Sequence, residues 1–155
     1  MIRLRKMTQN DSDLLLRWAN DPLTRQNSYH TASITPAEHQ KWFEKKIHDP
    51  FSHIYIFTDD TSDAAVGTVQ IEQKPLECVI GISVDKDWRG RSLATTMLKM
   101  SCRKFLEEVP GATIFAYIKT ENSASFKSFE RAGFSLVGTI HVHGSQSYKM
   151  EYSIQ

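Results

Sequence analysis

The sequence predicts a single α/β domain in which a mixed, mostly antiparallel sheet of six or seven strands is flanked by four helices. Short alternating apolar segments, typical of strands, recur between segments whose apolar residues have helical spacing. The chain has 155 residues, of which 40% are hydrophobic, so it is long enough to bury one core without metals or disulfides. No repeat or interdomain linker is visible, and we expect residues 1–155 to form one domain.

The first half of the chain predicts one strand, two helices and three further strands. Leu14, Leu15 and Trp18 share the inner face of a first helix, which we expect to stop at the Asn-Asp-Pro sequence of 20–22 and to be followed by a loop to residue 34. Thr35 and Glu38 form a capping box with a proline at the first helical position, so a second helix should begin there and reach about residue 48. The expected elements are a strand over 2–5, helices over 11–20 and 35–48, and strands over 53–58, 65–73 and 78–84.

The second half alternates helices and strands before it ends in two strands. Leu93, Met97 and Cys102 recur at helical spacing directly after a charged turn. Gly133 is placed to end a later helix. The expected elements are a helix from 93, a strand over 113–118, a helix over 122–132, and strands over 135–139 and 147–154, the last with Ile154 on its alternating face.

The most informative stretch is the turn between the strand ending at Val84 and the helix that follows. Arg89, Gly90, Arg91 and Ser92 precede the helix, whose first N–H groups are unpaired and point outward. The two guanidinium groups would add donors suited to phosphate oxygens. The turn therefore predicts a diphosphate site, although many such turns bind nothing. The ATP and NAD fingerprints are absent, which disfavours both nucleotides.

A second motif follows some thirty residues later. Arg89-Gly90-x-Ser92-x-Ala94 opens one helix, and Asn122-x-x-Ser125-x-x-x-Phe129-x-x-x-Gly133-Phe134 forms the next. The pair resembles the GCN5-related N-acetyltransferase (GNAT) superfamily over residues 67–153. The order of the expected strands and helices also matches the acetyltransferase fold.

The resemblance implies acetyl-CoA as the cofactor. In such enzymes the first motif holds the pyrophosphate through backbone amides, and a strand pairs with the pantetheine arm. The residues implied to bind the cofactor are Ile82, Ser83, Val84, Arg89, Gly90, Arg91, Ser92, Leu93, Ala94, Thr95, Asn122, Ser125 and Phe129.

Two residues depart from the family pattern. Ser92 stands where relatives usually have glycine, so its side chain requires a compatible backbone angle. Phe129 stands where many relatives have a tyrosine that is thought to protonate the leaving thiolate, and phenylalanine has no proton to give. Ser125, one turn earlier, could supply a hydroxyl instead; otherwise the thiolate leaves unprotonated, since a simple thiol has a pKa of about 8.5.

The region 17–43 resembles acetyltransferases that act on nucleotide-linked 4-amino sugars in pseudaminic-acid-type glycan synthesis. The shared features are an Arg-Asn-Pro entry and a helix with His39 followed by two aromatic residues. His39, Trp42 and Phe43 lie on one side of that helix, where they could bind a nucleotide or could simply pack on the sheet. The residues implied to bind the acceptor are Arg17, Asn20, Arg25, Ser28, His39 and Trp42.

The resemblance implies direct attack of the acceptor amine on the thioester, with an N–H of the strand ending at Val84 polarising the carbonyl oxygen. Candidate bases are Glu77, Tyr117 and His39. Glu77 could instead be a solvated turn residue, and Tyr117 could cover the other face of the sheet. No nucleophilic triad suggests a covalent intermediate.

Composition excludes several other functions. The net charge of +1 favours neither nucleic acid nor membrane as a partner. Cys78 and Cys102 are expected as buried free thiols, and the scattered histidines predict no metal site. Without an apolar leader we expect a cytoplasmic protein, and exposed edge strands would allow a homodimer. Two alternatives remain: acetylation of a protein N-terminus or small amine, and a non-catalytic acyl-CoA-binding module.

Overall fold

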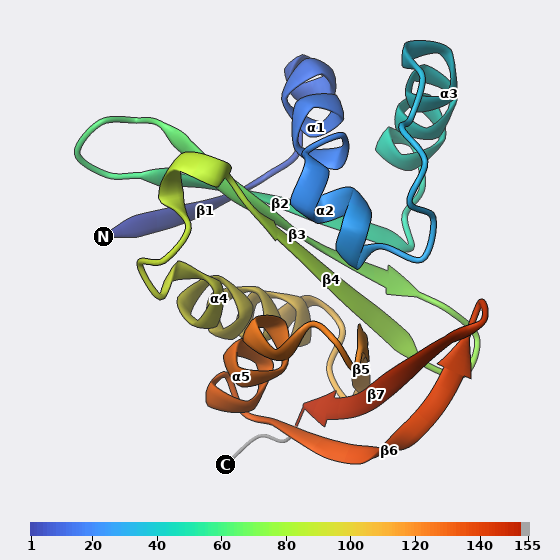
Figure 1. Cartoon of the computed structure of the whole chain (residues 1–155). Coiled ribbons are helices and arrows are strands. Elements are labelled where there is room, and N and C mark those ends of the chain that lie inside the picture. The colour runs from blue at the N-terminus through green and yellow to red at the C-terminus, as the bar shows by residue number, and fades with distance from the viewer. Residues whose placement is uncertain (153–155) are drawn as a thin grey trace.

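The computed structural model describes residues 1–152, which form one seven-stranded sheet in the order β1-β2-β3-β4-β5-β7-β6 (Figure 1). Neighbouring strands are antiparallel except β4 and β5, which run parallel. The predicted mixed, mostly antiparallel sheet is thereby confirmed. The strands are β1 (Ile2–Lys6), β2 (Ser52–Asp59), β3 (Ala65–Gln73), β4 (Cys78–Val84), β5 (Ile114–Lys119), β6 (Phe134–Val142) and β7 (Ser145–Tyr152).

Helices cover both faces of the sheet. One face carries the first three helices and the other carries the last two, as Figure 1 shows. Short 3-10 turns precede α1 (Gln9–Asp11) and α4 (Lys86–Trp88). The α-helices are α1 (Ser12–Ala19), α2 (Pro22–Asn27), α3 (Pro36–Ile47), α4 (Leu93–Glu108) and α5 (Ser123–Arg131).

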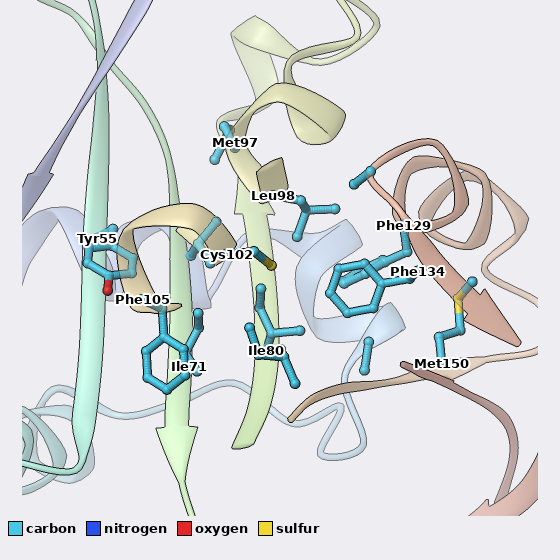
Figure 2. Packing of buried hydrophobic residues seen from close by; sticks show 14 of the residues in the cluster. Tyr55, Ile71, Ile80, Met97, Leu98, Cys102, Phe105, Phe129, Phe134 and Met150 are labelled. Carbon is cyan, nitrogen blue, oxygen red and sulfur yellow. The ribbon is translucent and has the colours of Figure 1, made fainter. Parts of the chain in front are cut away.

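Strand β2 shows how one sequence divides the core between the two faces. Its side chains alternate, so Ile54 and Ile56 pack beneath α1 and α3, whereas Tyr55 and Phe57 pack beneath α4. The larger cluster lies between α4, α5 and the sheet, where Phe105 and its neighbours fill the interior (Figure 2). The packing fixes α4 and α5 against the central strands and so positions their N-termini.

One helix was not predicted. The sequence at 20–22 reads as a helix stop followed by a loop, yet the structure begins α2 at Pro22, because proline at the first helical position starts a helix as readily as it ends one. The Asp21 side chain caps α2 by accepting from Thr24 N (3.2 Å). The other predicted elements are present with shifted ends, and β6 extends to Val142. The predicted position of Ile154 lies outside the described residues.

The two cysteines are free and buried, Cys78 with 7% and Cys102 with 0% of its surface exposed. Burial raises the pKa of the Cys102 thiol to about 12, so it stays protonated at neutral pH. Among residues 1–152, no helix combines the length and the apolar composition needed to cross a membrane.

Candidate active site

Strands β4 and β5 separate partway along their length. They pair only at Cys78 with Ile114 and at Val79 with Phe115, although β4 continues to Val84 and β5 to Lys119. On its other edge β4 stays paired with β3 along its whole length. The far halves of β4 and β5 therefore leave an opening in the middle of the sheet.

Backbone donors of β4 face this opening. Cys78 N donates to Thr113 O beside β5 (3.1 Å), and Asp85 N donates to Val66 O beside β3 (2.7 Å). Because the N–H groups of a strand alternate between its two edges, those of Ile82 and Val84 point towards β5, beyond the last paired residue. The opening is thus lined by N–H groups that can bind an extended acyl or amide chain.

The turn before α4 presents further backbone donors. Gly90 (φ 77°) and Ser92 (φ 60°) both adopt left-handed conformations. Ser92 is the N-cap of α4 and its side chain makes no capping hydrogen bond, which leaves the first N–H groups of the 16-residue helix to the cleft. Ser92 therefore adopts the angle that glycine favours, and these N–H groups at the positive end of the helix dipole suit an anion.

The two arginines of the turn already have partners. Arg89 forms an ion pair with Asp21, the residue that caps α2. Burial tends to raise the pKa of Asp21, but the Arg89 guanidinium and backbone N–H groups outweigh burial and lower it. The Arg91 guanidinium lies 4.6 Å from the centre of the Trp88 ring. Arg89 lines the cleft, whereas Arg91 and Thr95 are not among its lining residues.

Helix α5 contributes polar groups from its first turns. The Asn122 side chain accepts from Ser125 N (3.3 Å), and both residues line the cleft. Phe129 also lines it, but its ring is 2% exposed and packs edge-on against Phe134. Ser125 therefore lines the cleft one turn before the buried Phe129, and its role as a proton donor in place of tyrosine stays a prediction.

Helix α5 also carries two cationic residues that sequence reasoning missed. Lys127 and Arg131 line the cleft, and their helix lies beside α4 on the same face of the sheet (Figure 1). They are four residues apart, which places them on one face of the helix. This spacing was the available signal, because a basic pair next to a predicted diphosphate site can extend it.

A cleft of about 1390 Å³ joins these elements to α1, α2 and α3. Of the residues predicted to bind the acceptor, Arg25, Ser28, His39 and Trp42 line it, whereas Arg17 and Asn20 do not. The Asn20 amide instead donates to Ile34 O (2.8 Å) and accepts from Ile34 N (2.7 Å), which ties the end of α1 to the start of α3. Arg17 is 66% exposed and lies 3.5 Å from Asp85.

Two of the predicted acceptor residues hold the protein itself together. Arg25 donates to the carbonyl oxygens of Ala19 and His30, each at 2.6 Å, and so shapes the segment between α2 and α3. His39 is 4% exposed, and its Nε2 lies 2.9 Å from Ser12 O. Its ring stacks near Trp42, with 5.4 Å between the ring centres. Trp42 thus offers the cleft an aromatic surface backed by a fixed imidazole.

The other two candidate bases, Tyr117 and Glu77, are joined by hydrogen bonds. The Tyr117 hydroxyl donates to both carboxylate oxygens of Glu77, at 2.7 and 2.8 Å, and Lys149 Nζ lies 3.8 Å from the same carboxylate. Burial and the Glu77 carboxylate raise the pKa of Tyr117 to about 12. Tyr117 lines the cleft as a neutral phenol, with Glu77 behind it.

The family is decided by a family model that matches residues 2–135 and describes an acetyltransferase (GNAT) domain. The chain belongs to the GNAT acetyltransferase family. A mycothiol acetyltransferase of Mycolicibacterium gilvum (strain PYR-GCK) is 25% identical over 120 residues, which are 74% of this chain and 38% of that protein. The chain therefore spans less than half the length of this relative.

Solved structures share the GNAT fold at low sequence identity. A spermidine N-acetyltransferase from Vibrio cholerae in complex with CoA and spermine is 16% identical, with a TM-score of 0.85 and coverage of 97% of this chain and 94% of that one. The aminoglycoside acetyltransferase AAC(6')-Ib in complex with coenzyme A and kanamycin is 18% identical, with a TM-score of 0.83 and coverage of 99% and 95%.

The cleft of this GNAT domain is strongly cationic. Among the described residues, its lining includes five Lys or Arg side chains and one carboxylate, Glu38. The cations are Arg25, Arg89, Lys119, Lys127 and Arg131. Arg89 is paired with Asp21, but four further cations against one carboxylate favour anionic ligands over polycations.

Proposed function

We propose that the protein transfers the acetyl group of acetyl-CoA to a primary amine. The observation that carries the proposal is the opening between β4 and β5, where unpaired N–H groups meet the uncapped N-terminus of α4. Membership of the GNAT family supports it. When bound, acetyl-CoA supplies a thioester carbonyl that an amine can attack.

The chain offers groups for each part of the cofactor. The N–H groups at the start of α4, with Lys127 and Arg131 nearby, suit the diphosphate. Those of Ile82 and Val84 suit the pantetheine amides and the acetyl oxygen, where a fixed donor stabilises developing negative charge. Ser125 is the hydroxyl we assign to the leaving sulfur.

We assign removal of the amine proton to Tyr117 and Glu77 acting together. A neutral phenol can accept a proton from the amine only as it passes its own proton to Glu77, and the two hydrogen bonds provide that route. His39 is a poorer candidate because Nε2 is engaged with a backbone carbonyl oxygen.

The charge of the cleft supports a nucleotide-linked 4-amino sugar as the acceptor. Its phosphates would meet Lys119, a cation of the lining that is not assigned to CoA, and its base could stack on Trp42. A polyamine or an aminoglycoside carries several positive charges and would meet one carboxylate, Glu38. An open acidic groove would have favoured a peptide N-terminus as the acceptor. The lining of this cleft is cationic instead, which disfavours that alternative.

The proposed proton transfer from the amine through Tyr117 to Glu77 is tested by replacing each of the two residues. In a thiol-release assay with acetyl-CoA, Tyr117→Phe and Glu77→Gln should each lower kcat by about 10²-fold or more, with the KM for acetyl-CoA unchanged. Glu107→Gln, which removes an exposed carboxylate of α4, is the matched control. Full kcat in both variants would remove Tyr117 and Glu77 from the mechanism, and CoA binding without turnover of any amine would favour a non-catalytic acyl-CoA-binding module.

We further propose that two copies of the chain pair through β6. This edge strand is exposed on both faces along most of its length and, over nine residues, carries no Lys, Arg, Asp or Glu. The opposite edge, β1, has three basic residues in five, which is how natural sheets discourage edge pairing. The exposed apolar side chains of β6 are Leu136, Val137 and Ile140.

The hairpin geometry gives the pairing a register. Val142 and Ser145 flank a two-residue turn, and both central residues of that turn have positive φ. Val142 and Ser145 therefore exchange backbone hydrogen bonds with each other, and Ile140 does so with Ser147 of β7. Thr139 and His141 then direct their N–H and C=O groups outward. Two β6 strands, one from each copy, could pair antiparallel about a two-fold axis at Ile140. Thr139 of each copy would then join His141 of the other, giving four hydrogen bonds in total, and no charged side chains would face each other.

A further inference from the structure

A buried lysine without a carboxylate partner faces the acceptor end of the cleft. Lys119, the last residue of β5, is 8% exposed and lines the cleft. Its Nζ donates to Gln26 O (3.1 Å), and no carboxylate of the described residues lies within ion-pair distance of it. Lysine is almost never buried without a counter-charge, because desolvation of the ammonium is costly.

Lys119 is the first member of a series of neighbouring side chains that continues through Tyr29 and His143 to His30. The Lys119 ammonium lies 5.9 Å from the centre of the Tyr29 ring. The His143 ring lies between those of Tyr29 and His30, with centre-to-centre distances of 5.9 and 5.5 Å. All of these residues line the cleft, and His143 comes from the β6–β7 turn, which lies on the same side of the molecule as the segment between α2 and α3 (Figure 1).

The cluster is held in place by contacts on each side. The Tyr29 hydroxyl lies 2.7 Å from Ser147 Oγ, and Arg25 Nη1 donates to His30 O. His143 has φ 47° and occupies the first central position of its turn, where asparagine is favoured. A histidine there carries a backbone cost that the turn itself does not require.

We infer that Lys119, His30 and His143 form the subsite that binds the phosphates of the acceptor. Imidazole N–H groups and an ammonium are phosphate donors, and a phosphate would supply the counter-charge that Lys119 lacks. The Tyr29 ring closes one side of the subsite. This inference rests on the proposed function. Arg25, one of the residues that the resemblance implies in acceptor binding, is left out of the subsite because its guanidinium donates to backbone carbonyl oxygens.

The test measures UDP binding by calorimetry to protein saturated with CoA, so that the diphosphate site of α4 is filled. Wild type should bind UDP, and Lys119→Met should weaken it about tenfold or more. The same variant should unfold at a higher temperature, because it removes an uncompensated buried charge. Lys104→Met, which removes a half-exposed lysine of α4 that does not line the cleft, should bind UDP as wild type does.

His143→Asn separates binding from folding. Asparagine before Gly144 is the preferred pair for this turn, so the variant should be at least as stable as wild type and yet bind UDP several-fold more weakly. No UDP binding in the presence of CoA, or equal affinity in wild type, Lys119→Met and His143→Asn, would overturn the subsite. Lys119-dependent UDP binding without turnover of any amine would support the subsite while removing the proposed acetyl transfer.

Discussion

Ser92 holds a backbone conformation that a side chain makes costly. Its φ of 60° is left-handed, which costs a residue with a Cβ about 1–2 kcal/mol. Ser92→Gly should therefore stabilise the protein by about 0.5–1 kcal/mol, after the extra freedom of glycine in the unfolded chain is subtracted. Urea unfolding measures the difference.

Ser92→Ala is the matched control for this prediction. The Ser92 side chain makes no capping bond, so removal of its hydroxyl should change stability little. A less stable Ser92→Gly variant would mean that the side chain contributes an interaction that outweighs its backbone cost.

Tyr55 carries a hydroxyl with no hydrogen-bond partner among the described residues, on a side chain that is 0% exposed. Tyr55→Phe should stabilise the fold by about 1 kcal/mol at pH 7, because it removes an unsatisfied buried group. Burial and the Glu108 carboxylate raise the pKa of Tyr55 above its usual range.

The raised pKa of Tyr55 gives this prediction a pH dependence. Above pH 10 the unfolded chain releases the phenol proton while the native state keeps it, so stability falls as pH rises. Between pH 9 and 11 wild type should lose about 1.4 kcal/mol more than Tyr55→Phe. Urea unfolding at both pH values measures this, and parallel losses in the two proteins would contradict it.

Single residues also show where sequence reasoning stops. The arginines at 89 and 91 were predicted as phosphate contacts from the turn they occupy, but their partners Asp21 and Trp88 are visible only in the folded chain. Likewise, no local sequence signal indicates that His143 contacts Tyr29, because the β6–β7 hairpin that carries His143 lies more than a hundred residues after Tyr29.

Strand β4 provides the prediction at the scale of the element. Because its N–H groups alternate between a bonded and an open edge, the amides of Ile82 and Val84 should exchange with solvent at least tenfold faster than those of Gly81 and Ser83. Added acetyl-CoA should slow the first pair and leave the second unchanged. Hydrogen exchange followed by NMR measures all four, and uniform protection along β4 would contradict the opening in the sheet.

Elements with strong local signals were predicted well. Helix α3 begins where Thr35 and Glu38 form the capping pattern, and the three strands that follow were placed within a residue or so of their ends. Helix α2 was missed because Pro22 is ambiguous between a stop and a start. The separation of β4 from β5 has no sequence signal of its own beyond the family resemblance, since it depends on how two strands far apart in the chain diverge.

At the scale of the whole molecule, pairing through β6 predicts a dimer. Sedimentation of wild type should show a concentration-dependent dimer, and Ile140→Lys should shift it to monomer, because the two-fold axis places the two added charges together. Lys74→Glu, a charge change in the β3–β4 turn, is the control. A wild-type monomer at all concentrations, or an Ile140→Lys dimer, would contradict the pairing.

The cleft combines strand divergence, helix N-termini and side-chain charge, and together they support the proposed acetyl transfer to an anionic acceptor. The most direct test is thiol release from acetyl-CoA with a UDP-linked 4-amino-4,6-dideoxyhexose, the same amino sugar without the nucleotide, spermidine and kanamycin. We predict the highest kcat/KM with the nucleotide-linked sugar, a large loss without the nucleotide, and little turnover of the two polycations. Preferred turnover of spermidine or kanamycin would contradict the proposed anionic acceptor.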